Sequence, residues 1–221
     1  MTLCWLCVLA AAVPDDALLE KLGARALQLE TFANASRVTV DVVADELDGE
    51  GKVKKTTHTA LRVGRSGGKV DRKLLTYVED GEDLTERKRA ELEQPPKKPG
   101  AAVKSPFHPD ERKKYRFAVL TPPADQPALL RLGFQPAGDK TAELYIGDAT
   151  VDPESGDVWS LSLRPSKTPP LVDSLSIEAT LDAATPAGRA MSRLTLKGVA
   201  GILFFKQRFR VVTTFADYEP L

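Results

Sequence analysis

Two hydrophobic patterns of different period follow one another along this chain. From Pro14 to Ala33, apolar residues recur at the three- and four-residue spacing of a helix, and charged residues occupy most of the other positions. The apolar stripe consists of Leu18, Leu22, Ala26, Leu29 and Phe32. This spacing predicts one amphipathic helix whose apolar side packs against another part of the protein.

After Ala33 the period shortens to about two. Between Val38 and Ala44, small apolar residues alternate with polar ones, which is typical of a strand with one buried face. Similar segments recur at 52–63, 70–78, 115–119, 130–134, 144–151, 158–163, 175–181, 194–196 and 205–215. Successive strands joined by short turns indicate an antiparallel meander of about ten strands, and therefore a mainly β (α+β) fold.

One long segment, residues 80–109, interrupts the strands. Its first part, Thr85 to Glu93, is strongly charged and predicts a short helix. The following stretch, Gln94 to Phe107, is rich in Pro, Lys and Gly, which indicates either a lid or a linker. The strands on both sides look alike, so we expect a single domain over residues 13–221 with this segment inserted.

The chain begins with an apolar run of 11 residues, Leu3 to Val13. A bilayer span needs about 20 residues, so the run is too short to cross a membrane. It matches the hydrophobic region of a secretory signal, and Ala10-Ala11-Ala12 offers a cleavage site. We expect a signal peptide at residues 1–12, which would also remove Cys4 and Cys7, and a periplasmic or otherwise exported protein. The alternative is a buried first strand or helix.

Composition argues against several classes of function. The 31 basic and 31 acidic residues give no net charge, whereas nucleic-acid binders normally carry a basic excess. With only two His and two Cys, a zinc cluster or a thiol-rich scaffold is nearly excluded. The sequence has no nucleophile elbow, H-E-x-x-H helix or phosphate-binding loop, and its acidic groups lack calcium-loop spacing. We therefore expect no enzyme activity, no cofactor and no metal site.

A large sheet beside a single helix predicts a half-barrel. Eight or more strands enclose more volume than side chains easily fill, as in barrels that hold a ligand. We expect an unclosed antiparallel barrel wrapped over the N-terminal helix, with a sandwich of filled core as the alternative. Strand parity predicts the following cavity-lining, ligand-binding residues: Val40, Val42, Phe117, Val119, Leu161, Leu163, Ile177, Leu194, Leu196, Phe209 and Val211. Such a lining suits an acyl chain.

The order of these elements resembles the LolA-like family of periplasmic carriers and sorting proteins of outer-membrane lipoproteins. The similarity is carried by Leu18 to Phe32 running into Val38 to Ala44, by Tyr145 to Gly156, and by Leu171 to Tyr218. The resemblance implies an open barrel that shields acyl chains in transit between membranes, with lipid or an acylated lipoprotein as the bound partner and with no cofactor. The segment 80–109 departs from the family's pattern.

Basic residues gather at outward positions of the last two strands. They are Arg193, Lys197, Lys206, Arg208 and Arg210. One interpretation is a docking surface for anionic lipid head groups or for an acidic membrane partner. The other is a solvated outer face.

These patterns lead to one functional hypothesis and one alternative. The hypothesis is a monomeric periplasmic carrier or chaperone that binds lipoprotein acyl chains or lipid in a hydrophobic barrel, with an inner- or outer-membrane envelope protein as a further partner. The alternative is a non-catalytic protein-interaction or lipid-sensing regulatory module of the cell envelope. Neither involves nucleic acid.

Overall fold

The computed structural model describes residues 12–94, 104–202 and 205–221, without the side chains of Ile202 and Phe205. The predicted signal peptide at residues 1–12 therefore lies outside the described residues except for Ala12. The same holds for the middle of the Pro- and Lys-rich stretch. None of the helices in the described part combines the length and hydrophobicity that a membrane span requires.

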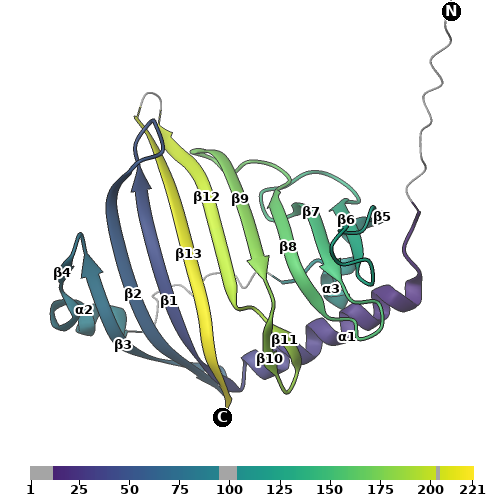
Figure 1. Ribbon diagram of the computed structural model, residues 1–221, viewed down its shortest axis with the longest axis horizontal. Coiled ribbons are helices and arrows are strands. Elements are labelled where there is room, and N and C mark those ends of the chain that lie inside the picture. Colours follow the sequence, from purple (N-terminus) through teal and green to yellow (C-terminus); the bar gives the residue numbers. More distant parts are fainter. Residues whose placement is uncertain (1–11, 95–103, 203–204) are drawn as a thin grey trace, which may run out of the picture.

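The predicted amphipathic helix is present as α1 (Asp16–Ala33), along the lower side of the molecule in Figure 1. Asp15 is its N-cap, because its carboxylate accepts a hydrogen bond of 3.0 Å from the Ala17 N–H. This bond satisfies one of the amide groups that a helix start leaves unpaired. Leu19 and Leu22 are buried. Two shorter helices follow: α2 (Thr85–Leu92) lies in the inserted segment, and α3 (Pro109–Arg112) begins at its last residue.

Eleven strands form one antiparallel sheet in the order β4-β3-β2-β1-β13-β12-β9-β8-β7-β6-β5. They are β1 (Ser36–Leu47), β2 (Val53–Ser66), β3 (Lys69–Glu79), β4 (Glu82–Asp83), β5 (Tyr115–Leu120), β6 (Leu130–Pro136), β7 (Tyr145–Val151), β8 (Val158–Pro165), β9 (Val172–Thr180), β12 (Arg193–Ile202) and β13 (Phe205–Pro220). A separate hairpin joins β10 (Ala183–Thr185) to β11 (Gly188–Ala190). The strands that the sequence did not predict are β4, β10 and β11, which are too short to show an alternating pattern.

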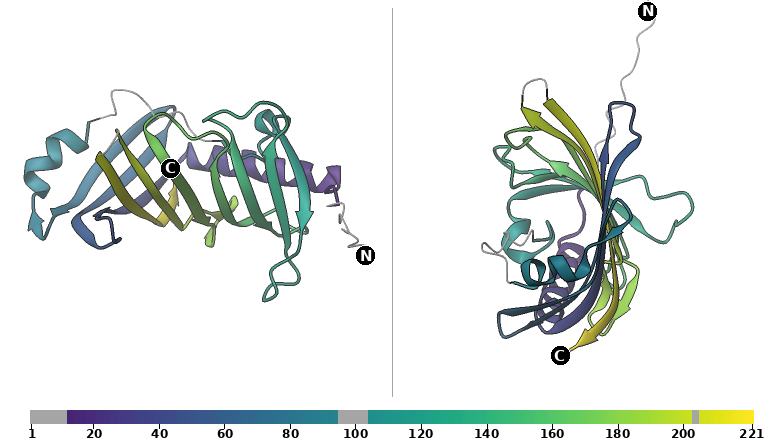
Figure 2. Two further views of the ribbon diagram at one scale, coloured as in Figure 1. Left: turned by 90° about the horizontal axis from the view of Figure 1, so that it is seen from above. Right: turned by 90° about the vertical axis from the view of Figure 1, so that its left-hand side faces the viewer.

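The sheet is open, because its edge strands β4 and β5 are not paired with each other. The mainly β, antiparallel and unclosed architecture is therefore confirmed. Strands β1 to β4 form one meander and β5 to β9 another, and β13 lies between β1 and β12. Figure 2 shows the sheet curving, with α1, α2 and α3 on the same side of it.

The buried core lies over β5 to β8. The core cluster consists of Leu19, Leu22, Phe107, Tyr115, Leu132, Phe134, Ala149 and Val151. Phe107 is fully buried, and its ring stacks on that of Phe117 and meets that of Phe134 edge-on, with ring centroids 5.4 and 6.2 Å apart. Aromatic pairs at these distances add to the gain from burial. Phe107 belongs to the inserted segment, so this segment contributes directly to the core.

Helix α2 covers the outer edge of β3. The backbone N–H of Leu74 donates to Glu93 Oε1 at 3.0 Å, and Arg89 Nη1 donates to the Leu74 carbonyl at 3.0 Å. The N–H of Tyr77 donates to the Thr85 hydroxyl at 2.9 Å. An uncovered edge strand offers such backbone groups to another chain. In the inserted segment, the predicted charged helix thus covers the edge of β3, and Phe107, from the stretch predicted as a lid or linker, fills the core.

Replacing Leu22 by alanine should strongly destabilise the fold. Leu22 is 1% exposed in the core cluster, whereas Leu27 on the same helix is 42% exposed. Leu22→Ala leaves a cavity, and we expect the free energy of unfolding to fall by about 2–5 kcal/mol, against about 0.5 kcal/mol for Leu27→Ala. Urea unfolding followed by circular dichroism measures both losses. Equal losses in the two variants would contradict the packing of α1.

Candidate binding face of the sheet

Cross-strand register places all eleven predicted cavity-lining residues on one face of the sheet. Residues directly opposite each other on antiparallel strands share a face. One row of opposite residues runs from Leu163 through Ile177 and Leu196 to Val211. The other seven residues lie on the same face, because each is an even number of positions along its strand from a residue that is paired on this face. They are Val40, Val42, Phe117, Val119, Leu161, Leu194 and Phe209. We call this side of the sheet the apolar face. Its role in binding a ligand stays a prediction.

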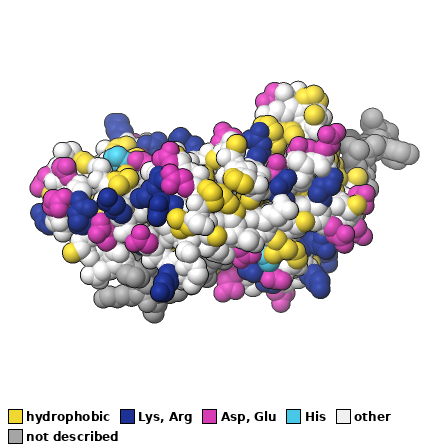
Figure 3. Space-filling model, turned by 90° about the horizontal axis from the view of Figure 1, so that it is seen from below, with side chains coloured by type: hydrophobic (Ala, Val, Ile, Leu, Met, Phe, Trp, Pro, Cys, Tyr) yellow, Lys and Arg dark blue, Asp and Glu magenta, His cyan; other side chains and the backbone are white. Residues whose placement is uncertain are grey.

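The core cluster lies at one end of the apolar face, and Leu74 is buried at the other end, on β3. Phe117, Val119, Leu161 and Leu163 pack against the cluster that contains Leu19 of α1. The other seven predicted residues neither belong to this cluster nor pack against it, and all are half-buried. These seven, which we call the open patch, are Val40, Val42, Ile177, Leu194, Leu196, Phe209 and Val211. From below, hydrophobic side chains gather along the middle of the molecule, with charged side chains denser toward its ends (Figure 3).

The largest side chain of the open patch, Phe209, lies over a glycine. Gly198 stands directly opposite Phe209 on the neighbouring strand β12. A Cβ added at Gly198 would lie 2.6 Å from Phe209 Cζ and 2.7 Å from the carbonyl oxygen of Ser174. Real Cβ atoms do not approach so closely, so the ring needs glycine at this position in order to reach across β12.

On β2 and β3 the apolar face continues at Leu61 and Leu74, opposite Val40, and is polar nearer the β1–β2 turn. Lys55 and Glu79 lie on this face by register, and Lys55 Nζ is 2.8 Å from Glu79 Oε1. The Tyr77 hydroxyl donates to Glu79 Oε2 at 3.0 Å. The hydrogen bonds from Lys55 and Tyr77 lower the pKa of Glu79, and the hydrogen bond to Glu79 raises the pKa of Lys55. This polar cluster forms the border of the open patch on that side.

The five basic residues predicted as a docking surface share the opposite face of the sheet. Arg193, Lys197, Lys206, Arg208 and Arg210 are all exposed and have the same parity on β12 and β13. Three of them are paired with carboxylates: Arg210 with Asp45 at 2.6 Å, Lys206 with Asp173 at 2.6 Å, and Lys197 with Glu178 at 3.7 Å. Within the described part of the chain, only Arg193 and Arg208 of the five make no ion pair. The face as a whole therefore carries mixed charge.

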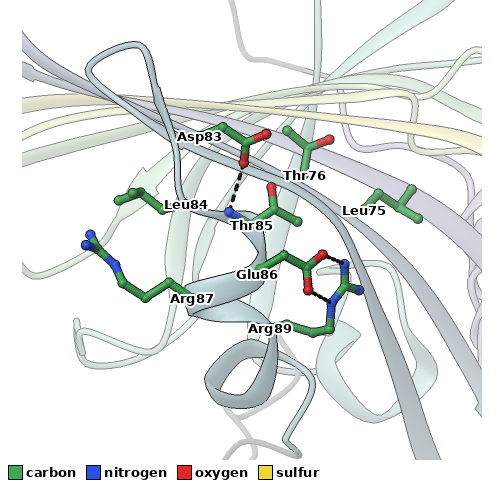
Figure 4. Close-up of a pocket in the computed structure, with 8 residues that line it drawn as sticks. All are labelled: Leu75, Thr76, Asp83, Leu84, Thr85, Glu86, Arg87 and Arg89. Carbon is green, nitrogen blue, oxygen red and sulfur yellow. Dashed lines mark hydrogen bonds and ion pairs between the residues drawn. The ribbon is translucent and has the colours of Figure 1, made fainter.

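A shallow pocket of about 600 Å³ lies beside the start of α2. It is lined by Leu75, Thr76, Asp83, Leu84, Thr85, Glu86, Arg87 and Arg89 (Figure 4). Several of its polar groups are engaged with one another: the Thr85 N–H donates to Asp83 Oδ1 at 2.9 Å, and Glu86 forms an ion pair with Arg89 at 2.7 Å. Hydrogen bonds from the Thr85 hydroxyl and backbone lower the pKa of Asp83. These contacts stabilise α2. Among the described residues, no group of three or more His, Cys, Asp or Glu side chains could hold a metal ion.

A partly buried polar contact between α1 and α3 was not predicted from the sequence. His108 is buried, and its Nε2 lies 2.9 Å from Glu30 Oε2. Its Nδ1 accepts a hydrogen bond of 3.2 Å from the Asp110 N–H and so caps α3. This network assigns the ring proton to Nε2, which donates it to Glu30. The available sequence signal was the pair Pro106 and Pro109, because prolines fix the backbone on both sides of the buried residues.

Comparison with known proteins gives weak similarities only. No family model matches the chain, and no curated protein matches it. Among solved structures, the chain is similar to a DUF1329 family protein from Desulfovibrio piger, with 11% identity, coverage of 95% of this chain and 94% of that chain, and a TM-score of 0.44. It is also similar to a chain in the Pseudomonas aeruginosa MucA/MucB complex, at 9% identity and a TM-score of 0.24, and to a chain of MucB in complex with MucA(peri), at 8% and 0.23. Each of these two matches covers 90% of this chain and 98% of the other. Similarity at this level assigns the chain to no family.

Proposed function

We propose that this protein binds the acyl chain of a lipid or of an acylated lipoprotein on the open patch. One observation carries the proposal: the apolar face continues across the sheet between two buried ends, the core cluster over β5 to β8 and Leu74 on β3, and the open patch between them lies outside the core cluster. Soluble proteins rarely leave a contiguous apolar surface without a partner. An apolar molecule on the open patch would complete the burial that α1 provides at the other end.

The chemistry of the open patch supports binding over catalysis. Its seven side chains are aliphatic or aromatic, and Thr213, which lies between Val42 and Leu194 on the same face, is buried. The patch crosses β9, β12, β13 and β1, which together span about 15 Å at the usual strand spacing. An acyl chain on this surface gains free energy with each methylene group that it buries. Curvature of the sheet around α1 would give the patch a concave wall.

This proposal describes a carrier or chaperone that has no enzymatic activity and acts as a monomer after export. The apolar run of residues 3–13 supports export, because it matches a secretory signal. The covered edge of β3 supports a monomer, since edge-to-edge association needs free backbone groups. A protein-interaction or lipid-sensing module would use the same open patch for a partner segment, and the experiments below separate the two.

A charge in the open patch should abolish acyl binding, whereas the same charge on the neighbouring residue should not. Val211 belongs to the patch, and Val212 follows it on β13 with its side chain on the opposite face. Both valines are half-buried. We expect Val211→Asp to weaken binding of a fluorescent long-chain fatty acid at least about tenfold, because a carboxylate would have to lose its hydration against the chain. Titration of the probe into each variant measures the affinities.

Val212→Asp is the matched control, and we expect it to bind the probe like the unmodified protein. Thermal unfolding of both variants checks that they remain folded at the temperature of the titration. Equal affinities for Val211→Asp and Val212→Asp would place the binding site elsewhere. An unmodified protein that binds no acyl probe would remove the proposed function and favour the interaction module.

The natural cargo should remain bound during gentle purification. We expect native mass spectrometry of the mature protein, taken from its own cell envelope, to show a stoichiometric lipid or acylated lipoprotein. Identification of the extracted molecule names the cargo class. A mass that corresponds to the polypeptide alone, together with a protein cross-linked through the open patch, would contradict the carrier.

A further inference from the structure

One end of the sheet brings together an exposed apolar residue and basic residues from neighbouring segments. The connection between β8 and β9 ends at Leu171, whose carbonyl accepts a hydrogen bond of 2.9 Å from the Gly201 N–H on β12. Gly201 in turn lies directly opposite Lys206 on β13. Arg208 follows on the same face of β13. We call Leu171, Lys206 and Arg208 the outer end; it lies at the top of Figure 1, away from α1.

Leu171 is exposed and also has an unfavourable backbone conformation. Its side chain is 62% exposed and its φ is +66°. The left-handed region is an outlier for a bulky residue, whereas Gly and Asn adopt it at lower cost. A leucine here does not serve packing within the described residues, because most of its surface faces solvent. Local conflicts of this kind are expected where function requires the side chain.

Basic side chains outnumber acidic ones around Leu171, where Asp173 supplies one carboxylate. Lys206 and Arg208 are exposed, and so is Lys167 in the connection that leads to Leu171. Lys206 pairs with Asp173 at 2.6 Å, but both side chains are about half exposed, at 57% and 46%. An exposed pair of this kind contributes little and exchanges readily with other anions.

We propose that the outer end docks on the surface of an anionic lipid bilayer. Leu171 enters the boundary between head groups and acyl chains, and Lys206 and Arg208 contact the anionic head groups. Exposed apolar side chains flanked by Lys and Arg are the combination that binds such surfaces. Phe209 of the open patch directly follows Arg208, so docking brings the open patch next to the bilayer. The docking proposal rests on residues outside the open patch and is independent of acyl binding.

Sedimentation of the mature protein with lipid vesicles tests this docking. We expect the protein to bind vesicles of phosphatidylcholine with phosphatidylglycerol and to bind vesicles of phosphatidylcholine alone much more weakly. Leu171→Asn should weaken binding to the anionic vesicles about tenfold, because the inserted side chain is lost. Thermal stability should not fall, since asparagine accepts the left-handed conformation.

Two further variants distinguish the docking surface from a general effect of surface change. Leu221→Asn removes a leucine that is 54% exposed at the opposite end of the sheet, and we expect unchanged vesicle binding. Lys206→Glu combined with Arg208→Glu should abolish the preference for phosphatidylglycerol and the dependence of binding on salt.

Three outcomes would overturn the docking proposal. They are anionic vesicles that bind no protein, equal binding to both vesicle types, and binding that Leu171→Asn leaves unchanged. The acyl titration separates this failure from that of the proposed function. If Leu171→Asn loses vesicle binding but still binds the acyl probe, the result supports both proposals. If the unmodified protein binds vesicles but no acyl probe, the carrier function is wrong and the docking surface remains.

Discussion

The pairing of β1 with β13 holds the two halves of the sheet together. It runs from Ser36 opposite Pro220 to Leu47 opposite Arg208, and thus joins the first strand of the chain to the last. Across this pair, Arg210 contacts Asp45 at 2.6 Å, and the Asp45 side chain is only 6% exposed. Without the pairing of β1 with β13, the sheet would separate into two parts. The open patch, which crosses β9, β12, β13 and β1, would then be divided. The candidate site therefore exists only when both ends of the chain are in place. Contacts between residues so distant in sequence form slowly, since closing a long loop costs entropy.

The faces of the strands were predictable because strand side chains alternate with a period of two. Odd–even alternation along each strand alone assigned eleven residues to one face. The observed cross-strand pairing places all eleven on the same face. The order of the strands was not predictable, because the place of β13 between β12 and β1 depends on tertiary contacts. Which part of the face belongs to the core was not predictable either. Leu161 and Leu196 occupy similar alternating patterns, yet only Leu161 packs against the core cluster with α1.

The inserted segment shows that amino-acid composition can predict the kind of structure in a region but not the contacts of a single residue. The high content of Pro, Lys and Gly in Gln94 to Phe107 predicts irregular structure and led to the interpretation of a lid or linker. A single Phe among prolines nevertheless fills the centre of the core, and Glu93 satisfies the backbone of an edge strand. Average composition does not predict which single side chain will pack against residues that are distant in the sequence. The His108–Glu30 contact is a similar case, because its partners are far apart in sequence.

Natural selection acts differently on the packed end of the apolar face and on the open patch. Changes in Leu22, Phe107 or Leu132 affect folding and are removed whatever the protein binds. Changes in Leu196 or Val211 alter the shape of the open patch with little effect on the core. Under the proposed function, one scaffold could therefore acquire new apolar cargoes by drift in the open patch, without a compensating change in the packed end. Descendants of a common ancestor would then keep the packed end recognisable and diverge in the open patch.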